Sequence, residues 1–115
     1  MIQIGIIGGS GYTGGELIRL LINHPAAEIN FVYSRTKAGE PLYRAHEDLL
    51  GITNLCFTDS VDPTIDLVFL CLGHGHSKDF LEKNPFSDAT KIIDLSTDFR
   101  AQANASLLGK TFVYG

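Results

Sequence analysis

The sequence predicts an α/β fold of the Rossmann type, a doubly wound and mostly parallel sheet with helices on both faces. Three observations predict it. Residues 2–7 form a charge-free, isoleucine-rich run, which is typical of a strand buried on both faces. Gly8, Gly11 and Gly14 follow with the spacing G-x-x-G-x-x-G, and leucine and isoleucine then recur at helical spacing. Farther along, apolar strand-like runs alternate with helical segments, as they do in βαβ units.

A strand, a glycine turn and a helix in this order form a cradle for phosphate groups. Glycines let the backbone approach a pyrophosphate, and the helix N-terminus offers unpaired N–H groups and a partial positive charge. We expect Ser10 to cap this helix and Glu16 to place negative charge in its first turn. The residues predicted to bind a dinucleotide here are Gly8, Ser10, Gly11, Tyr12, Thr13 and Gly14.

Two other readings of the glycine segment fail on residue type. No Gly-Lys-Ser/Thr follows the glycines, so the segment is not a Walker A loop. A hydrolase nucleophile elbow around Ser10 would need glycine where Tyr12 stands.

The composition limits the class of protein further. The 115 residues make one domain, with an ordinary hydrophobic content of 44%. Nine Lys and Arg against 13 Asp and Glu give a net charge of −4, which argues against a nucleic-acid surface. We find no membrane-length apolar run and no signal-peptide pattern, so we expect a cytoplasmic protein. Cys56 and Cys71 lie in apolar contexts, which predicts reduced, buried and inert thiols.

The residues at the end of the second predicted strand indicate which nicotinamide cofactor is bound. A helix over residues 12–23 ends before Pro25, and residues 28–33 form the strand that completes a βαβ unit. In an NAD site an Asp or Glu roughly 20 residues beyond the glycines binds the ribose hydroxyls. Ser34 and Arg35 stand there instead, and they suit a 2′-phosphate. This predicts NADP, with a solvated polar turn as the alternative.

The segment after this strand end is less regular. Residues 43–50 are compatible with a short helix, and residues 55–57 with a short strand. His46 lies beside Glu47 and Asp48, a cluster that we interpret as solvated surface rather than as a metal site.

The clearest later strand covers residues 66–72, and a glycine- and histidine-rich loop follows it at positions 73–77. A helix over residues 78–84 comes next. Ligands of open α/β sheets collect at the carboxyl ends of strands, so this loop should face the same crevice as the glycine loop. In an extended loop His74 and His76 would lie on one side, but no third zinc ligand stands out. Close approach of the backbone to a cofactor explains the glycines better.

The last predicted strands place polar groups at the same crevice. Residues 91–95 form a strand, and a polar block that ends at Arg100 leaves it. Arg100 suits an anion clamp for a substrate, with a plain surface position as the alternative. Residues 102–108 are expected to be helical or irregular, and a further strand starts at residue 111. The chain stops at Gly115 within that strand, so we expect residues 1–115 to be one truncated NAD(P)-binding domain of a longer protein.

Several of these stretches together resemble the N-acetyl-γ-glutamyl-phosphate reductase family over essentially the whole chain. The run Gly8-Gly9-Ser10-Gly11-Tyr12-Thr13-Gly14-Gly15-Glu16-Leu17 resembles the opening of that family, and Ile93-Asp94-Leu95-Ser96-Thr97-Asp98-Phe99-Arg100 resembles a second signature block. Gly73 departs from the family, which usually has proline before the histidine. The resemblance implies that Gly73, His74 and Ser96 bind the cofactor and that Arg100 contributes to a substrate phosphate pocket.

The resemblance also implies a reaction. In this family NADPH reduces N-acetyl-γ-glutamyl phosphate to the semialdehyde through a cysteine thioester, with release of phosphate and with a histidine as acid and base, in arginine biosynthesis. Val113-Tyr114-Gly115 resembles the start of a third family block, and in the family the cysteine and the histidine both lie beyond it. We therefore expect this chain to be the NADP-binding part, without catalytic residues and inactive on its own. The full-length enzyme would act on a small-molecule substrate and would form a homodimer or homotetramer. Alternatives are an aspartate-semialdehyde dehydrogenase-like enzyme and a non-catalytic NADP-sensing module.

Overall fold

A computed structural model describes residues 1–73, 75–95, 106–107 and 110–111 of the chain. Its centre is a five-stranded sheet in which every neighbouring pair is parallel, with the order β3-β2-β1-β4-β5. This order, with crossovers between non-adjacent strands, is that of a Rossmann-type fold and confirms the predicted fold class. The strands are β1 (Ile2–Ile7), β2 (Ala27–Tyr33), β3 (Phe57–Thr58), β4 (Leu67–Leu70) and β5 (Lys91–Asp94).

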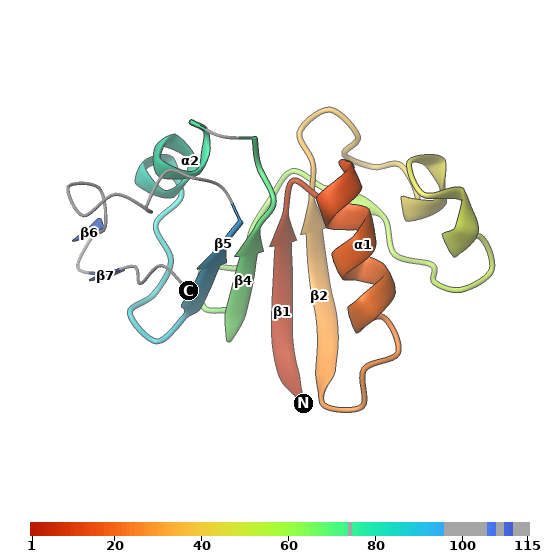
Figure 1. Cartoon of the computed structure of the whole chain (residues 1–115), viewed down its shortest axis with the longest axis horizontal. Helices are drawn as coiled ribbons and strands as arrows, with labels where there is room; N and C mark the ends of the chain where they lie inside the picture. Colours follow the sequence, from red (N-terminus) through yellow and green to blue (C-terminus); the bar gives the residue numbers. More distant parts are fainter. Residues whose placement is uncertain (74, 96–105, 108–109, 112–115) are drawn as a thin grey trace.

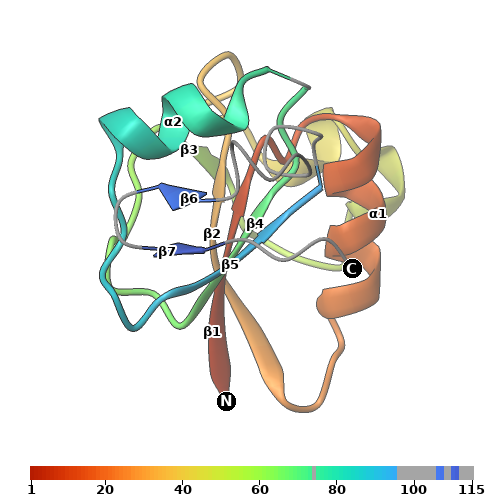
Figure 2. The same cartoon turned by 60° about the vertical axis from the view of Figure 1, so that its left-hand side comes forward.

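Helices cover the two faces of this sheet. Helix α1 (Tyr12–Leu21) lies against β1 and β2, and α2 (Ser77–Lys83) lies on the opposite side of the sheet (Figures 1 and 2). Beside α1, the connection from β2 to β3 contains two short 3₁₀ helices, η1 (Leu42–Arg44) and η2 (Glu47–Leu49). A separate antiparallel pair consists of β6 (Ser106–Leu107) and β7 (Lys110–Thr111).

The hydrophobic core consists of two clusters, one on each face of the sheet. On the α1 face, Ile4 and Ile6 of β1 pack with Ile18 of α1 and with residues of the 3₁₀ segment. On the α2 face, Ile7 and β4 residues pack with Leu81. Because β1 supplies both clusters, it is buried on both sides as its apolar run predicts.

Strand β2 contains a β-bulge that the sequence pattern does not reveal. The register with β1 runs from Ile4–Ile29 to Gly5–Phe31, so Asn30 is an extra residue. Ile29 therefore packs on the α1 face while Phe31 packs on the α2 face, although a regular strand would place both on one face. The Phe31 ring covers Gly5, where an added Cβ would lie only 2.3 Å from Cζ.

Element boundaries differ from the sequence predictions in several places. Strand β4 is shorter than the predicted 66–72, and α2 begins and ends one residue earlier than the predicted 78–84. Helix α1 ends at Leu21 rather than at residue 23, and the His24 N–H donates to the Leu21 carbonyl in the turn before Pro25. The predicted helix over residues 43–50 is instead the pair η1 and η2. Cys56 precedes β3 and bridges to Pro41, so the predicted strand over residues 55–57 starts two residues later. Residues 106–107, which we expected to be helical or irregular, form β6 instead. Residues 96–105, 108–109 and 112–115, which complete the last predicted segments, lie outside the described residues.

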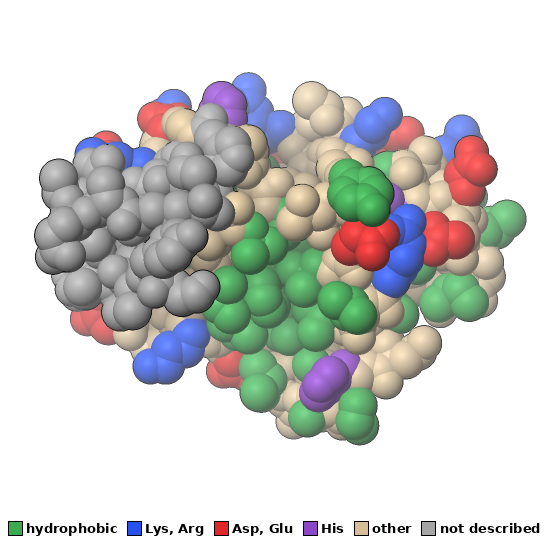
Figure 3. Space-filling model, viewed as in Figure 1, with side chains coloured by type: hydrophobic (Ala, Val, Ile, Leu, Met, Phe, Trp, Pro, Cys, Tyr) green, Lys and Arg blue, Asp and Glu red, His purple; other side chains and the backbone are tan. Residues whose placement is uncertain are grey.

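One part of the sheet surface remains apolar and accessible. Apolar side chains gather over β1 and β4 beside α1 (Figure 3). Leu67, Phe69 and Cys71 contribute to this face, and Ile93 on the neighbouring β5 is 41% exposed. Among the described residues, no helix is long and apolar enough to cross a membrane.

Candidate dinucleotide-binding site

The glycine loop is fixed between the ends of β1 and β2. Gly8 has φ +82°, a conformation that favours glycine, and the N–H groups of Gly8 and Gly9 both donate to the Tyr33 carbonyl at 2.9 and 3.1 Å. An added Cβ at Gly14 would lie 2.7 Å from the Gly9 Cα and 2.8 Å from the Gly8 carbonyl oxygen. Gly8 and Gly14 are therefore required by the fold itself.

Gly11 is different, because the protein leaves it room. An added Cβ would meet only the Gly8 carbonyl oxygen, at 3.9 Å. Gly11 is also the N-cap of α1, and no side chain caps this helix end. The first-turn N–H groups consequently lack the usual capping oxygen, as a site for an anion requires.

Two expectations for this helix end are therefore wrong. Ser10 does not cap α1; its Oγ accepts a hydrogen bond from Ser34 Oγ at 3.3 Å instead. Glu16 lies beyond the first turn, where it pairs with Arg19 at 2.9 Å. With neither oxygen at the helix end, its positive partial charge stays available to a bound anion.

A groove of about 330 Å³ runs from the glycine loop across the strand ends. It contains four of the predicted cofactor residues: Gly8, Ser10, Ser34 and Arg35. The other lining residues were not predicted, and they come mainly from the end of β2 and from α2: Tyr33, Thr36, Leu72, His76, Asp79, Phe80, Lys83 and Asn84. Tyr12 and Thr13 are exposed on the first turn of α1 beside this groove but do not line it.

Ser34 and Arg35 differ in their availability to a ligand. Ser34 is 5% exposed, and its N–H and Oγ bind the Thr58 carbonyl and Ser10 Oγ respectively. Arg35 is exposed at the groove. The guanidinium of Arg35 is therefore an accessible, charged donor group at the end of β2.

Helix α2 forms the opposite wall of the groove. The Phe80 ring packs edge-on against Tyr33, with ring centroids 5.1 Å apart. One turn further, Lys83 Nζ pairs with Asp79 Oδ2 at 3.1 Å. A sequence signal existed, because Phe80 is an aromatic residue on the helix predicted after the strand over residues 66–72, close to the expected crevice. Nothing local paired it with Tyr33.

Gly73 and His76 are joined by a turn-type hydrogen bond in the loop after β4. The His76 N–H donates to the Gly73 carbonyl at 3.2 Å, and Gly75 has φ +89°. The His76 ring packs on Gly73, where an added Cβ would lie 3.3 Å from Cδ2, and it lines the groove near Arg35. His74, Ser96 and Arg100 lie outside the described residues, so their predicted roles stay predictions.

The interpretation of His46 as solvated surface is wrong. His46 is 5% exposed, and its Nε2 lies 2.6 Å from the Gly9 carbonyl oxygen. The segment folds back onto the glycine loop because Leu42 and Leu49, on either side of His46, belong to the core cluster under α1.

The two cysteines also differ from each other. Cys71 is partly buried after β4, and burial, with a smaller contribution from Asp94, raises the pKa of its thiol to about 11. This agrees with the predicted inert thiol. Cys56 is exposed, which overturns its predicted core position.

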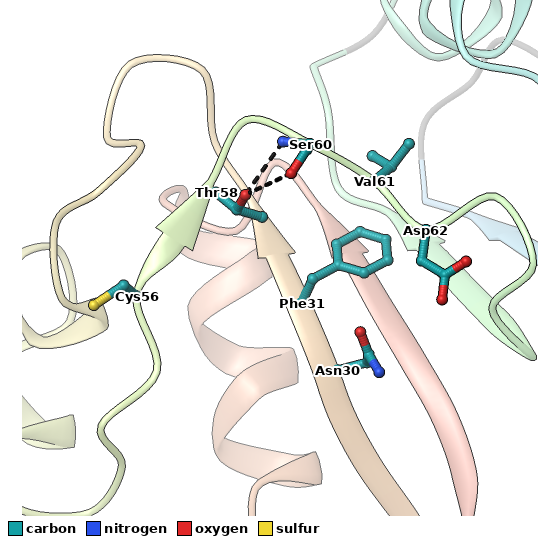
Figure 4. A pocket seen from close by; sticks show the side chains of 7 residues that line it. All are labelled: Asn30, Phe31, Cys56, Thr58, Ser60, Val61 and Asp62. Carbon is teal, nitrogen blue, oxygen red and sulfur yellow. Dashed lines mark hydrogen bonds between the residues drawn. The ribbon is translucent and has the colours of Figure 1, made fainter.

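A second hollow, of about 350 Å³, lies between β2 and the segment after β3 (Figure 4). Phe31 lines it, and Cys56 lies at its edge. Thr58 and Ser60 bond each other here, with their hydroxyl oxygens 3.1 Å apart. This hollow has neither a glycine loop nor a helix N-terminus, so the groove at the strand ends is the better candidate. Within the described part of the chain, no three His, Cys, Asp or Glu side chains could hold a metal ion together.

A groove at the carboxyl ends of parallel strands, beside an uncapped helix N-terminus, defines the class: a Rossmann-type domain for a dinucleotide. The family model described as "Semialdehyde dehydrogenase, NAD binding domain" matches residues 3–114. The chain belongs to this family.

Curated relatives narrow the comparison. The chain is 57% identical over 115 residues to an N-acetyl-gamma-glutamyl-phosphate reductase of Flavobacterium johnsoniae and 56% identical to one of Christiangramia forsetii. Each match covers the whole of this chain but only 35% of the length of the relative. Among solved structures, aspartate semialdehyde dehydrogenase with NADP from Candida albicans matches 89% of the chain and 31% of its own, with a TM-score of 0.66 and 18% identity. That likeness supports the fold alone.

Proposed function

We propose that the chain is the NADP-binding part of a cytoplasmic oxidoreductase that reduces N-acetyl-γ-glutamyl phosphate to N-acetyl-glutamate semialdehyde and releases phosphate, in arginine biosynthesis. The observation that carries the reaction is the identity of 57% over the whole chain to a reductase of that name. An aspartate-semialdehyde dehydrogenase remains the alternative, supported by fold likeness at 18% identity.

The described residues fit a dinucleotide with an adenosine 2′-phosphate. The uncapped N-terminus of α1 and the open space at Gly11 suit the pyrophosphate. Arg35 would hold the 2′-phosphate as a planar donor fork. Asp79 is the carboxylate among the described groove residues, and its pairing with Lys83 reduces its repulsion of a phosphate.

The bound cofactor would supply hydride, and the described residues would supply binding and orientation. Neither described cysteine suits the role of the nucleophile that displaces phosphate. The raised pKa of Cys71 keeps it a neutral thiol, and Cys56 lines the second hollow instead of the groove. We therefore propose that the catalytic residues lie in the part of the relatives that this chain does not span, together with most of a dimer or tetramer interface. Arg100 would contribute to binding the substrate phosphate.

Calorimetric titration of the chain with NADPH and NADH tests the cofactor preference. We expect tighter binding of NADPH, and Arg35→Ala should weaken it about 10-fold to 100-fold while leaving NADH affinity unchanged, because a hydrogen bond to a charged group is lost. Lys83→Ala is the matched control: it removes a cation from the same groove, but one already paired with Asp79. Equal affinities for NADPH and NADH, or equal losses in both variants, would remove the argument for NADP.

A further inference from the structure

His46 occupies a closely fitted position beneath the glycine loop. Its ring lies against α1 at Gly15, where an added Cβ would be 2.6 Å from Cε1 and 2.7 Å from Nδ1. Phe57 lies near it, with ring centroids 6.3 Å apart and a tilt of 59°. Gly15 thus makes room for the imidazole, and any larger residue at position 15 would displace it.

The polar contact of His46 is as specific as its packing. The partner of Nε2 is the Gly9 carbonyl oxygen, which can only accept a hydrogen bond. Nε2 therefore carries the hydrogen and donates it. A buried carbonyl without a partner is costly, so His46 does more than fill space here.

Fixing this carbonyl also fixes the next amide. The peptide between Gly9 and Ser10 is planar and trans, so its C=O and N–H groups point in opposite directions. With the Gly9 oxygen held inward by His46, the Ser10 N–H points away from the core, and Ser10 lines the groove. Glycine at position 9 would otherwise allow this peptide to rotate.

The segment that carries His46 is itself held against α1. Arg19 Nε and Nη2 donate to Asp48 Oδ2 and Oδ1 at 2.5 and 2.9 Å. This bidentate pair lowers the pKa of the Asp48 carboxyl. The core packing of Leu49 adds an apolar attachment next to it.

We propose that His46 is a positioning residue for the pyrophosphate: it holds the Gly9–Ser10 peptide so that the Ser10 N–H faces the bound anion. This inference rests on the proposed dinucleotide function, and it predicts an effect limited to ligands that contain a pyrophosphate. A purely structural histidine would affect all ligands of the groove alike.

The test compares NADPH with 2′-AMP, which has the adenosine 2′-phosphate but no pyrophosphate. In His46→Leu we expect NADPH affinity to fall about tenfold or more and 2′-AMP affinity to stay within about twofold. His46→Gln, whose amide can donate to the same carbonyl, should restore most of the NADPH affinity. Leu49→Ala, a core truncation in the same segment, should lower the unfolding midpoint without changing the ratio of the two affinities. Equal losses of both ligands in His46→Leu, or no loss, would overturn the proposal.

A separate measurement distinguishes failure of this inference from failure of the proposed function. If the unsubstituted chain bound neither NADPH nor NADH, the proposed function would be wrong. The role of His46 would then be decided with inorganic pyrophosphate, by following the amide resonance of Ser10 by NMR. A shift in the unsubstituted chain that is lost in His46→Leu supports the proposal, and no shift, or the same shift in both, overturns it.

Discussion

One methyl group added at Gly11 or at Gly14 separates the contribution of the glycine loop to the fold from its contribution to the ligand. The two glycines lie three residues apart in the same motif, yet their surroundings are opposite. At Gly14 a Cβ would collide with backbone atoms 2.7 and 2.8 Å away, whereas at Gly11 the nearest atom is 3.9 Å away. The two alanine variants therefore make the same chemical change, but one should affect stability and the other should affect ligand binding.

Gly14→Ala should destabilise the fold. Its clash is with backbone atoms of Gly8 and Gly9, which cannot rotate away as a flexible side chain would. Overpacking of this kind costs about 1–3 kcal/mol, and alanine returns up to about 1 kcal/mol through its higher helix propensity. Because the colliding atoms are rigid, we expect a net loss of about 2 kcal/mol in the free energy of unfolding.

Gly11→Ala should leave stability nearly unchanged. Its φ of −83° and ψ of 178° are accessible to alanine. The poorer N-cap and the smaller entropy of the unfolded chain offset each other to within about 0.5 kcal/mol. The methyl group would occupy the open space that we assign to the pyrophosphate, so NADPH affinity should fall at least about tenfold, as 1.4 kcal/mol of lost binding energy implies.

Urea unfolding followed by circular dichroism gives the stability of both variants, and calorimetric titration gives their NADPH affinity. If Gly11→Ala binds NADPH like the unsubstituted chain, the open space at Gly11 does not hold the pyrophosphate. If Gly11→Ala unfolds as easily as Gly14→Ala, the space at Gly11 is not open to a methyl group.

Three further predictions concern the thiols and the start of α2. At pH 8 a thiol reagent should modify exposed Cys56 first, and Cys71, with its pKa of about 11, should react roughly 100 times more slowly than an ordinary thiol in mass-spectrometric time courses. The thiol of Cys71 loses its proton near pH 9 in the unfolded chain but only near pH 11 in the folded one, so this residue stabilises the fold fully below about pH 9 and loses that stabilisation, up to about 3 kcal/mol, as the pH rises toward 11. Cys71→Ala should therefore remove this part of the alkaline loss of stability in urea titrations. Ser77→Ala should lower the unfolding free energy by about 1 kcal/mol, because buried Ser77 donates to Asp94 Oδ1 at 2.8 Å, and an unchanged urea midpoint would contradict this.

Local patterns predicted the parts of the site that depend on neighbouring residues. The charge-free run before Gly8 was sufficient for β1, and the glycine spacing was sufficient for the start of α1. The position of Arg35 followed from counting along one βαβ unit. Each of these features is set by backbone conformation within a few residues, which the sequence encodes directly.

His46 and the α2 wall depend on contacts between distant segments, so no local pattern reveals them. A histidine followed by Glu47 and Asp48 has the charged neighbours of a surface residue, and its burial follows only when the segment folds onto α1. Gly15 carries a faint signal, since a second glycine inside a helix costs stability unless something packs closely against it. Nothing in the sequence indicates that this partner is His46.

The bulge at Asn30 explains how the end of β2 comes to support the glycine loop. A strict alternation from Ile29 would place Phe31 on the α1 face and Val32 on the other. The extra residue reverses this, so Val32 lies directly under Gly9, where an added Cβ would be 2.1 Å from Val32 Cγ1. The bulge is absorbed before Gly5, and Tyr33 still pairs with Ile7, which keeps its carbonyl within reach of the loop N–H groups. The loop is thus supported from below by β2 and from the side by His46, and both supports depend on tertiary structure.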